Sequence, residues 1–278
     1  MSEINLALTA RNIRENIVNC IGSLGVGHIG GSLSIADLLA VLYGKHLKYD
    51  PKNPKMEGRD RLVCSKGHAG PAIYAVLAEF GFFDKAVLET LNQGGTTLPS
   101  HCDMNKTPGV DMTAGSLGQG FSCAVGCALG SKLRKDGATI YAIIGDGESQ
   151  EGQIWEAGMY ASHAKLDNLI AFTDYNKMQL DDYTANINDL DPLDKKWEAF
   201  GWTVVGCENG NDMKQMVDAL TLAKTLSGKG KPVVVLMKTE MGYGVDFMQG
   251  TNKYHGVAPS NDELERALAQ LNETLGDY

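Results

Sequence analysis

The sequence predicts an α/β fold in which helices flank a mostly parallel β-sheet. Two features of the chain support this prediction. Short apolar runs rich in β-branched residues alternate with stretches whose apolar residues recur at helical spacing. The clearest unit has such runs at 139–144 and 169–173, with a helical pattern at 149–164 between them. Strand, helix and strand in this order predict that the two strands are parallel.

The other expected elements follow the same alternation along the chain. Residues 4–22 form an amphipathic helical pattern, and Ser34 is the expected N-cap of the next helix. Further strands are expected at 61–64, 202–206 and 232–238, and further helices at 34–46, 70–80, about 120–135, 211–226 and from 260 onward. Long loops are expected at 47–60, 94–120 and 179–195. We expect one domain over residues 1–278, with a C-terminal helical tail at about 260–278.

Composition excludes several classes of function. The 278 residues are 43% hydrophobic and 21% charged, which is ordinary for a globular protein that buries its own core. A formal net charge of −9 argues against nucleic acid or an anionic membrane as the main partner. Six cysteines without a C-x-x-C pair fit a reducing compartment. Because neither a signal peptide nor a membrane-spanning run is evident, we expect a cytoplasmic protein.

A metal site is expected where the two clearest strands end. Asp146 lies between two glycines just after the first strand, and Asn176 lies just past the second. Parallel strands end at the same edge of the sheet, where α/β proteins bind ligands. The carboxylate of Asp146, the amide oxygen of Asn176 and the backbone carbonyl of Met178 suit Mg²⁺, with Ca²⁺ or Mn²⁺ as substitutes. An isolated Gly-Asp-Gly is also compatible with an ordinary turn.

A second group of residues suits an anionic ligand. Lys66 and His68 follow the strand at 61–64 and precede a helix, whose first N–H groups are free to bind an anion. Lys66 is equally compatible with a solvated surface charge. Glycines crowd around His28, which indicates either a close approach of the backbone or a flexible turn.

The segments Gly-Asp-Gly-Glu-Ser-Gln-Glu-Gly (145–152) and Asp-Tyr-Asn-Lys (174–177) resemble the thiamine-diphosphate motif of transketolases. The resemblance covers roughly residues 4–258 and only the first half of a full-length transketolase. It implies the diphosphate-binding domain of the thiamine-diphosphate fold. It also implies transfer of a two-carbon ketol unit from a ketose phosphate to an aldose phosphate, with thiamine diphosphate and Mg²⁺ as cofactors. The pentose phosphate pathway or a more specialised ketose would supply the substrate.

The resemblance also assigns site residues. His28, His101 and His255 match histidines that contact the substrate, although Ile29 stands where many relatives have proline. The cofactor-binding residues that it implies are Lys66, His68, Gly115, Leu117, Gly147, Glu151, Asp174, Asn176, Lys238 and His255. In the family, the residue that matches Glu151 joins a network between two active sites. From its position alone, Glu151 is equally a partner for the helix dipole.

In the family, the glutamate that activates the cofactor lies in a pyrimidine-binding domain, which has no counterpart here. The resemblance therefore implies a split transketolase whose C-terminal subunit is a separate chain, most simply in an α₂β₂ assembly. One alternative is a thiamine-diphosphate-binding subunit with a non-catalytic or regulatory role. Two other classes, a half of a deoxyxylulose-phosphate synthase-like enzyme and a 2-oxo acid dehydrogenase α chain, share the cofactor motif. An NAD-binding Rossmann domain is disfavoured, because no G-x-G-x-x-G follows an early strand.

Overall fold

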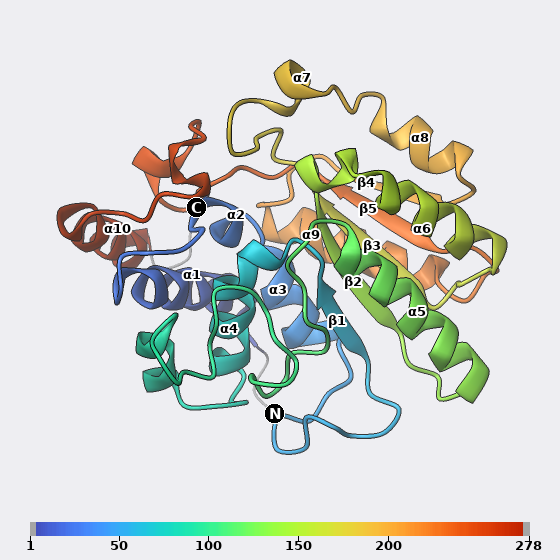
Figure 1. The fold of residues 1–278 in the computed structure, drawn as a ribbon, viewed down its shortest axis with the longest axis horizontal. Coiled ribbons are helices and arrows are strands. Elements are labelled where there is room, and N and C mark those ends of the chain that lie inside the picture. The colour runs from blue at the N-terminus through green and yellow to red at the C-terminus, as the bar shows by residue number, and fades with distance from the viewer. Residues whose placement is uncertain (1–3, 275–278) are drawn as a thin grey trace.

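The computed structural model describes residues 4–274, and its centre is a five-stranded parallel sheet (Figure 1). The strands are β1 (Arg61–Cys64), β2 (Ile140–Gly145), β3 (Leu169–Asp174), β4 (Thr203–Cys207) and β5 (Val233–Met237). Their order in the sheet is β1-β2-β3-β5-β4, and every neighbouring pair is parallel. The predicted parallel α/β fold is confirmed. Residues 275–278 of the predicted C-terminal tail lie outside the described residues.

Helices cover both faces of the sheet. The longer ones are α1 (Leu6–Gly22), α4 (Gly70–Glu79), α5 (Gln119–Arg134), α6 (Gly152–His163), α9 (Met213–Leu226) and α10 (Asn261–Thr274). The shorter ones are α2 (Gly30–Leu33), α3 (Ala36–Val41), α7 (Thr184–Ile187) and α8 (Leu193–Ala199). The core therefore has two apolar layers, one on each side of the sheet.

The alternation of side chains along the strands explains these two layers. On β2, Tyr141 and Ile143 pack into the layer formed with α1, α3, α4 and α9, whereas Ile140, Ala142 and Ile144 pack against α5 and α6. Because successive side chains of a strand point to opposite faces, a strand buried on both faces must be apolar throughout. This is why β2 and β3 appear in the sequence as continuous apolar runs.

Two predicted elements differ from the structure. The expected helix 34–46 consists of α3 and a π-helical turn at Leu42–His46, and the separate short helix α2 precedes it. Ser34 is not the N-cap of α3, which is Ile35; it instead ends α2, and its hydroxyl donates to Asp174 Oδ2 at 2.8 Å. The predicted loop 179–195 contains α7 and the start of α8, which is anchored by the fully buried Trp197.

The described helices bear on the expected absence of a membrane span. Among residues 4–274, no helix is both long and apolar enough to cross a bilayer. All six cysteines lie in this part of the chain and are free thiols.

Candidate active site

A cavity of about 290 Å³ lies at the C-terminal ends of β1, β2 and β3. Most of the predicted site residues line it, although they come from segments spread over more than two hundred positions of the chain. These residues are His28, Lys66, His68, His101, Gly115, Leu117, Asp146, Gly147, Asp174, Asn176, Met178 and His255. The sheet edge therefore gathers the predicted metal, anion and substrate groups in one place.

The turn after β2 fixes Asp146 against the loop after β3. Asp146 is buried, and its Oδ1 accepts a hydrogen bond from the Gly147 N–H at 2.7 Å. Its Oδ2 accepts from the Lys177 N–H at 2.5 Å, in the loop that also carries Asn176 and Met178. Burial and the nearby charge of Asp174 raise the pKa of Asp146 to about 7. A divalent cation beside this carboxylate would favour its ionised form.

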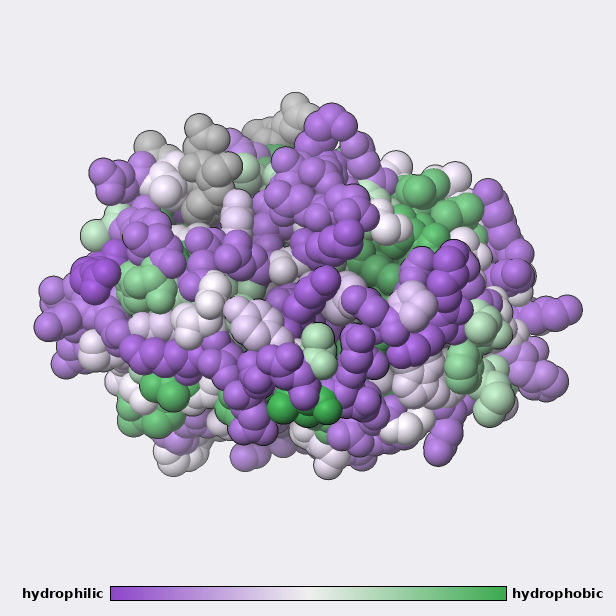
Figure 2. All heavy atoms as spheres, turned by 90° about the horizontal axis from the view of Figure 1, so that it is seen from above, coloured by the Kyte–Doolittle hydropathy of each residue, from purple (hydrophilic) through white to green (hydrophobic). Residues whose placement is uncertain are grey.

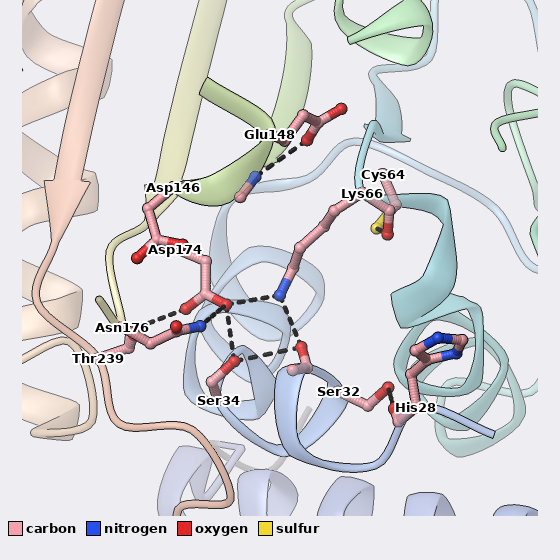
Figure 3. A network of polar contacts seen from close by, with 12 residues as sticks. His28, Ser32, Ser34, Cys64, Lys66, Asp146, Glu148, Asp174, Asn176 and Thr239 are labelled. Atoms are coloured by element: carbon pink, nitrogen blue, oxygen red, sulfur yellow. Dashed lines mark hydrogen bonds and ion pairs between the residues drawn. The ribbon is translucent and has the colours of Figure 1, made fainter. Parts of the chain in front are cut away.

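Lys66 and Asp174 form a buried ion pair at the base of the cavity (Figure 3). The Lys66 ammonium donates to Asp174 Oδ2 at 2.5 Å and to the Gly31 carbonyl oxygen at 2.6 Å. Asp174 also accepts from Ser34 and Thr239, and from the Asn176 side-chain amide at 3.0 Å. This last bond turns the amide nitrogen of Asn176 toward Asp174. Because an ammonium has three donors, Lys66 keeps one for an anion in the cavity.

Replacing Lys66 with methionine is expected to destabilise the chain by about 3 kcal/mol or more, because Asp174 is left charged and buried without its cation. Urea unfolding followed by circular dichroism measures this change. Lys132→Met is the matched control, since it removes the partly exposed pair between Lys132 and Asp167, worth at most about 1 kcal/mol. Equal effects of the two substitutions would contradict the structural role of the Lys66 pair.

Four histidines converge over the mouth of the cavity. The ring of His28 lies 5.2 Å from that of His68 and 6.1 Å from those of His101 and His255, between centroids. Burial, followed by the nearby charge of His101, lowers the pKa of His28. Burial also lowers the pKa of His68 well below its usual value, and that of His255 to about 4. His28, His68 and His255 are therefore neutral at pH 7 and can each accept or donate a hydrogen bond.

The buried carboxylate of Glu148 forms hydrogen bonds with the turns after β1 and β2 and with the start of α5. Its Oε1 accepts from the Ser65 hydroxyl at 2.5 Å and from the Gly118 N–H at 2.7 Å, and its Oε2 accepts from the Gly145 N–H at 3.0 Å. Ser65 in turn accepts from the Phe121 N–H at 2.8 Å. These bonds hold the start of α5, and with it Gly115 and Leu117, beside the turns after β1 and β2.

Two predicted cofactor residues lie outside this cavity. Lys238 pairs with Glu208 at a separate cavity, and its backbone N–H donates to Cys207 O at the end of β4. Lys238 follows the C-terminal end of β5, but its side chain turns toward Glu208 and does not line the cavity, so its contact with the cofactor stays a prediction. The next residue, Thr239, is the one that reaches Asp174. Glu151 is exposed at the start of α6 and is absent from the residues that line the cavity.

Several residues of the site escaped the sequence analysis. Gly31, Gly145, Glu148, Gln179 and Leu180 also line the cavity, and Ser34 and Thr239 position Asp174. Their only local signal is proximity to a glycine-rich turn or a strand end.

The residues present fit a divalent cation with a diphosphate. The oxygens of Asp146 and Asn176 and the peptide at Met178 supply hard ligands on one side. Lys66 and His68 supply donors on the other. Among the described residues, His255 Nδ1 and Gln179 Oε1 are buried without a hydrogen-bond partner. Buried polar atoms are rarely left unpaired, so this cavity is built for a polar ligand.

Comparison with known proteins identifies relatives over almost the whole chain. The family model described as the thiamine diphosphate binding domain of transketolase matches residues 6–276. The chain is 52% identical to the 6-deoxy-6-sulfo-D-fructose transketolase subunit of Clostridium sp. (strain MSTE9), over 98% of both chains. It is 41% identical to an apulose-4-phosphate transketolase subunit of Actinobacillus succinogenes, again over 98% of both. The transketolase structure from Leishmania mexicana superposes with a TM-score of 0.90 at 31% identity, covering 97% of this chain and 41% of that one.

Proposed function

The chain belongs to the transketolase family as an N-terminal subunit with its thiamine-diphosphate-binding domain, and we propose that it binds Mg²⁺ through Asp146, Asn176 and Met178. The observation that carries this proposal is the convergence of these residues with Lys66 and His68 at one sheet edge. Thiamine diphosphate supplies the carbanion chemistry when bound. The protein supplies its orientation and its electrostatic surroundings.

The proposed cofactor site divides between the two ends of the cavity. Lys66, His68 and Gly147 would hold the diphosphate beside the metal, with Asp174 keeping Lys66 and Asn176 in place. Gly115 and Leu117, fixed through Glu148, would support the planar aminopyrimidine ring. His28, His101 and His255 would contact the hydroxyls of the sugar and exchange protons with them.

The chain is proposed to act with a separate subunit that supplies the pyrimidine-binding domain. It spans 41% of the length of a single-chain relative but 98% of the relatives named as subunits. Helices α5 and α6 expose Leu133, Met159 and Tyr160, at 75%, 59% and 47% of their surfaces. Figure 2 shows several hydrophobic areas among the hydrophilic atoms of one face. Such surfaces support an interface, most simply in a cytoplasmic α₂β₂ assembly, where the exposed Glu151 would meet a second chain.

A ketose with a terminal anionic group is the proposed donor, since the relatives at 52% and 41% identity are named for a sulfonated and a phosphorylated ketose. The test mixes the chain with its partner subunit, thiamine diphosphate and Mg²⁺. It then compares 6-deoxy-6-sulfofructose, apulose 4-phosphate and xylulose 5-phosphate as donors. We expect the highest kcat/KM with the sulfonated ketose. Preference for xylulose 5-phosphate would instead indicate the pentose phosphate pathway. No transfer from any donor, with cofactor bound, would favour a non-catalytic role.

A further inference from the structure

A second cavity, of about 580 Å³, lies at the opposite end of β1 from the candidate active site. Its walls are residues 52–55, Arg59 and Arg61 on one side and residues 104–111, which follow His101, on the other. Arg61 begins β1 and Lys66 follows its end, so the four-residue strand separates the two sites by roughly 13 Å of extended chain.

The lining of this cavity is strongly basic although the chain as a whole carries a charge of −9. Its cationic residues are Lys52, Lys55, Arg59, Arg61 and Lys106. Asp111 is the only carboxylate among the described residues that line it. Its oxygens already accept from Arg59 and from the Leu62 N–H, the latter at 2.8 Å. Four positive charges are thus left in excess, and clustered cations concentrate anions from solution.

Arg61 places a donor at this cavity that the described part of the protein does not satisfy. Its Nη1 is buried and finds no hydrogen-bond partner within residues 4–274. A buried donor without an acceptor is costly, and a guanidinium pairs best with the oxygens of a phosphate or carboxylate. Asp111 carries one negative charge and pairs with Arg59, so it cannot neutralise Arg61 as well. An anion between Arg61 and the lysines would satisfy this donor.

We propose that this cavity is a regulatory site for a small sugar that carries two phosphate groups. One phosphate ester carries about −1.5 to −2 charges at pH 7, so two such groups balance the four excess positive charges. Among the described residues, none that lines the cavity has an aromatic ring on which a nucleobase could stack. A sugar bisphosphate therefore fits the lining better than a nucleotide does.

One loop, residues 101–117, lines both cavities and therefore connects the basic cavity to the active site. His101 precedes the cavity-lining segment 104–111, and Gly115 and Leu117 follow it, so the loop lines the active site at both ends and the basic cavity in between. The Ala114 N–H donates to Cys102 O at 3.1 Å and closes the base of this loop. An anion on Lys106 would restrict the loop and favour cofactor binding. By linkage, the cofactor would favour the anion equally.

The test is a titration of the full, ¹⁵N-labelled chain with fructose 1,6-bisphosphate, followed by amide chemical shifts. Shifts are expected at residues 59–61 and 104–111. Lys55 and Lys106 are exposed residues that line the cavity. Replacing both with alanine is expected to weaken binding about tenfold or more, because the ligand loses two charged contacts. Lys229→Ala with Lys231→Ala removes the same charge from an exposed turn outside the cavity and is expected to leave the affinity unchanged.

Three outcomes would overturn this proposal. Shifts confined to Lys66, His68 and their neighbours would place the sugar phosphate in the active site alone. Equal weakening by the two lysine pairs would mean diffuse electrostatic attraction. Loss of binding on addition of the partner subunit would assign the cavity to the subunit interface. None of these results involves ketol transfer, so this proposal can fail while the proposed function stands.

Discussion

Replacing Asp146 with alanine is expected to abolish Mg²⁺-dependent binding of thiamine diphosphate by the assembled enzyme, weakening it at least about 100-fold. Asp146 is the one charged ligand in the proposed metal set, since Asn176 and Met178 offer neutral oxygens. Without it, nothing on that side of the cavity would hold the cation against the diphosphate. The side chain is buried and accepts from Gly147 and Lys177, so the loop after β3 would also lose its link to β2.

Isothermal titration of the complex with thiamine diphosphate at saturating Mg²⁺ measures this loss. Asp181→Ala is the matched control, because it removes the same charge from an exposed position in the loop after Met178. Asp146→Asn removes the charge but keeps the shape of the side chain, because an amide oxygen replaces a carboxylate oxygen. This variant is expected to bind the cofactor weakly. Affinity equal to that of the unmodified complex in Asp146→Ala would refute the metal assignment, provided that circular dichroism shows a folded chain.

The sequence alone was enough to predict the parallel sheet and to predict that Asp146 and Asn176 lie together at one edge of it. Both follow from local patterns: an apolar run ends in a polar turn, and parallel strands bring such turns to one edge. The gathering of His28, His101 and His255 around this edge did not follow from any local pattern. Their segments are joined only by tertiary packing, and they were predicted together only through the family resemblance.

The residues that hold the site in place were beyond sequence reasoning. Ser34 and Asp174 are 140 positions apart, and Ser65 and Glu148 are 83 apart. Hydroxyl groups of this kind show no periodicity, so they resemble caps or loop residues, as Ser34 did. Successive side chains alternate at the end of a strand, and after β5 it is Thr239, the residue next to Lys238, that reaches Asp174.

Ketol transfer is expected only when this chain is mixed with the subunit that carries the pyrimidine-binding domain, and the lone chain is expected to show none above background. The carboxylates of the cavity are the reason for this expectation. Within residues 4–274, those that line it are Asp146, Glu148 and Asp174. Asp146 accepts from two backbone N–H groups, and Asp174 accepts from Lys66 and three other side chains.

Glu148 accepts from Ser65, Gly118 and Gly145 and cannot turn toward a cofactor ring without breaking the start of α5. Among the described residues that line the cavity, no carboxylate is therefore free to act as the acid or base that the cofactor needs. Loss of such a group costs about 10²- to 10⁴-fold in rate. Turnover should be measured for each chain alone and for the mixture, with cofactor and Mg²⁺ present throughout. Transfer by the lone chain that Glu148→Gln removes would show that Glu148 does leave its three donors, and that the partner is dispensable for chemistry.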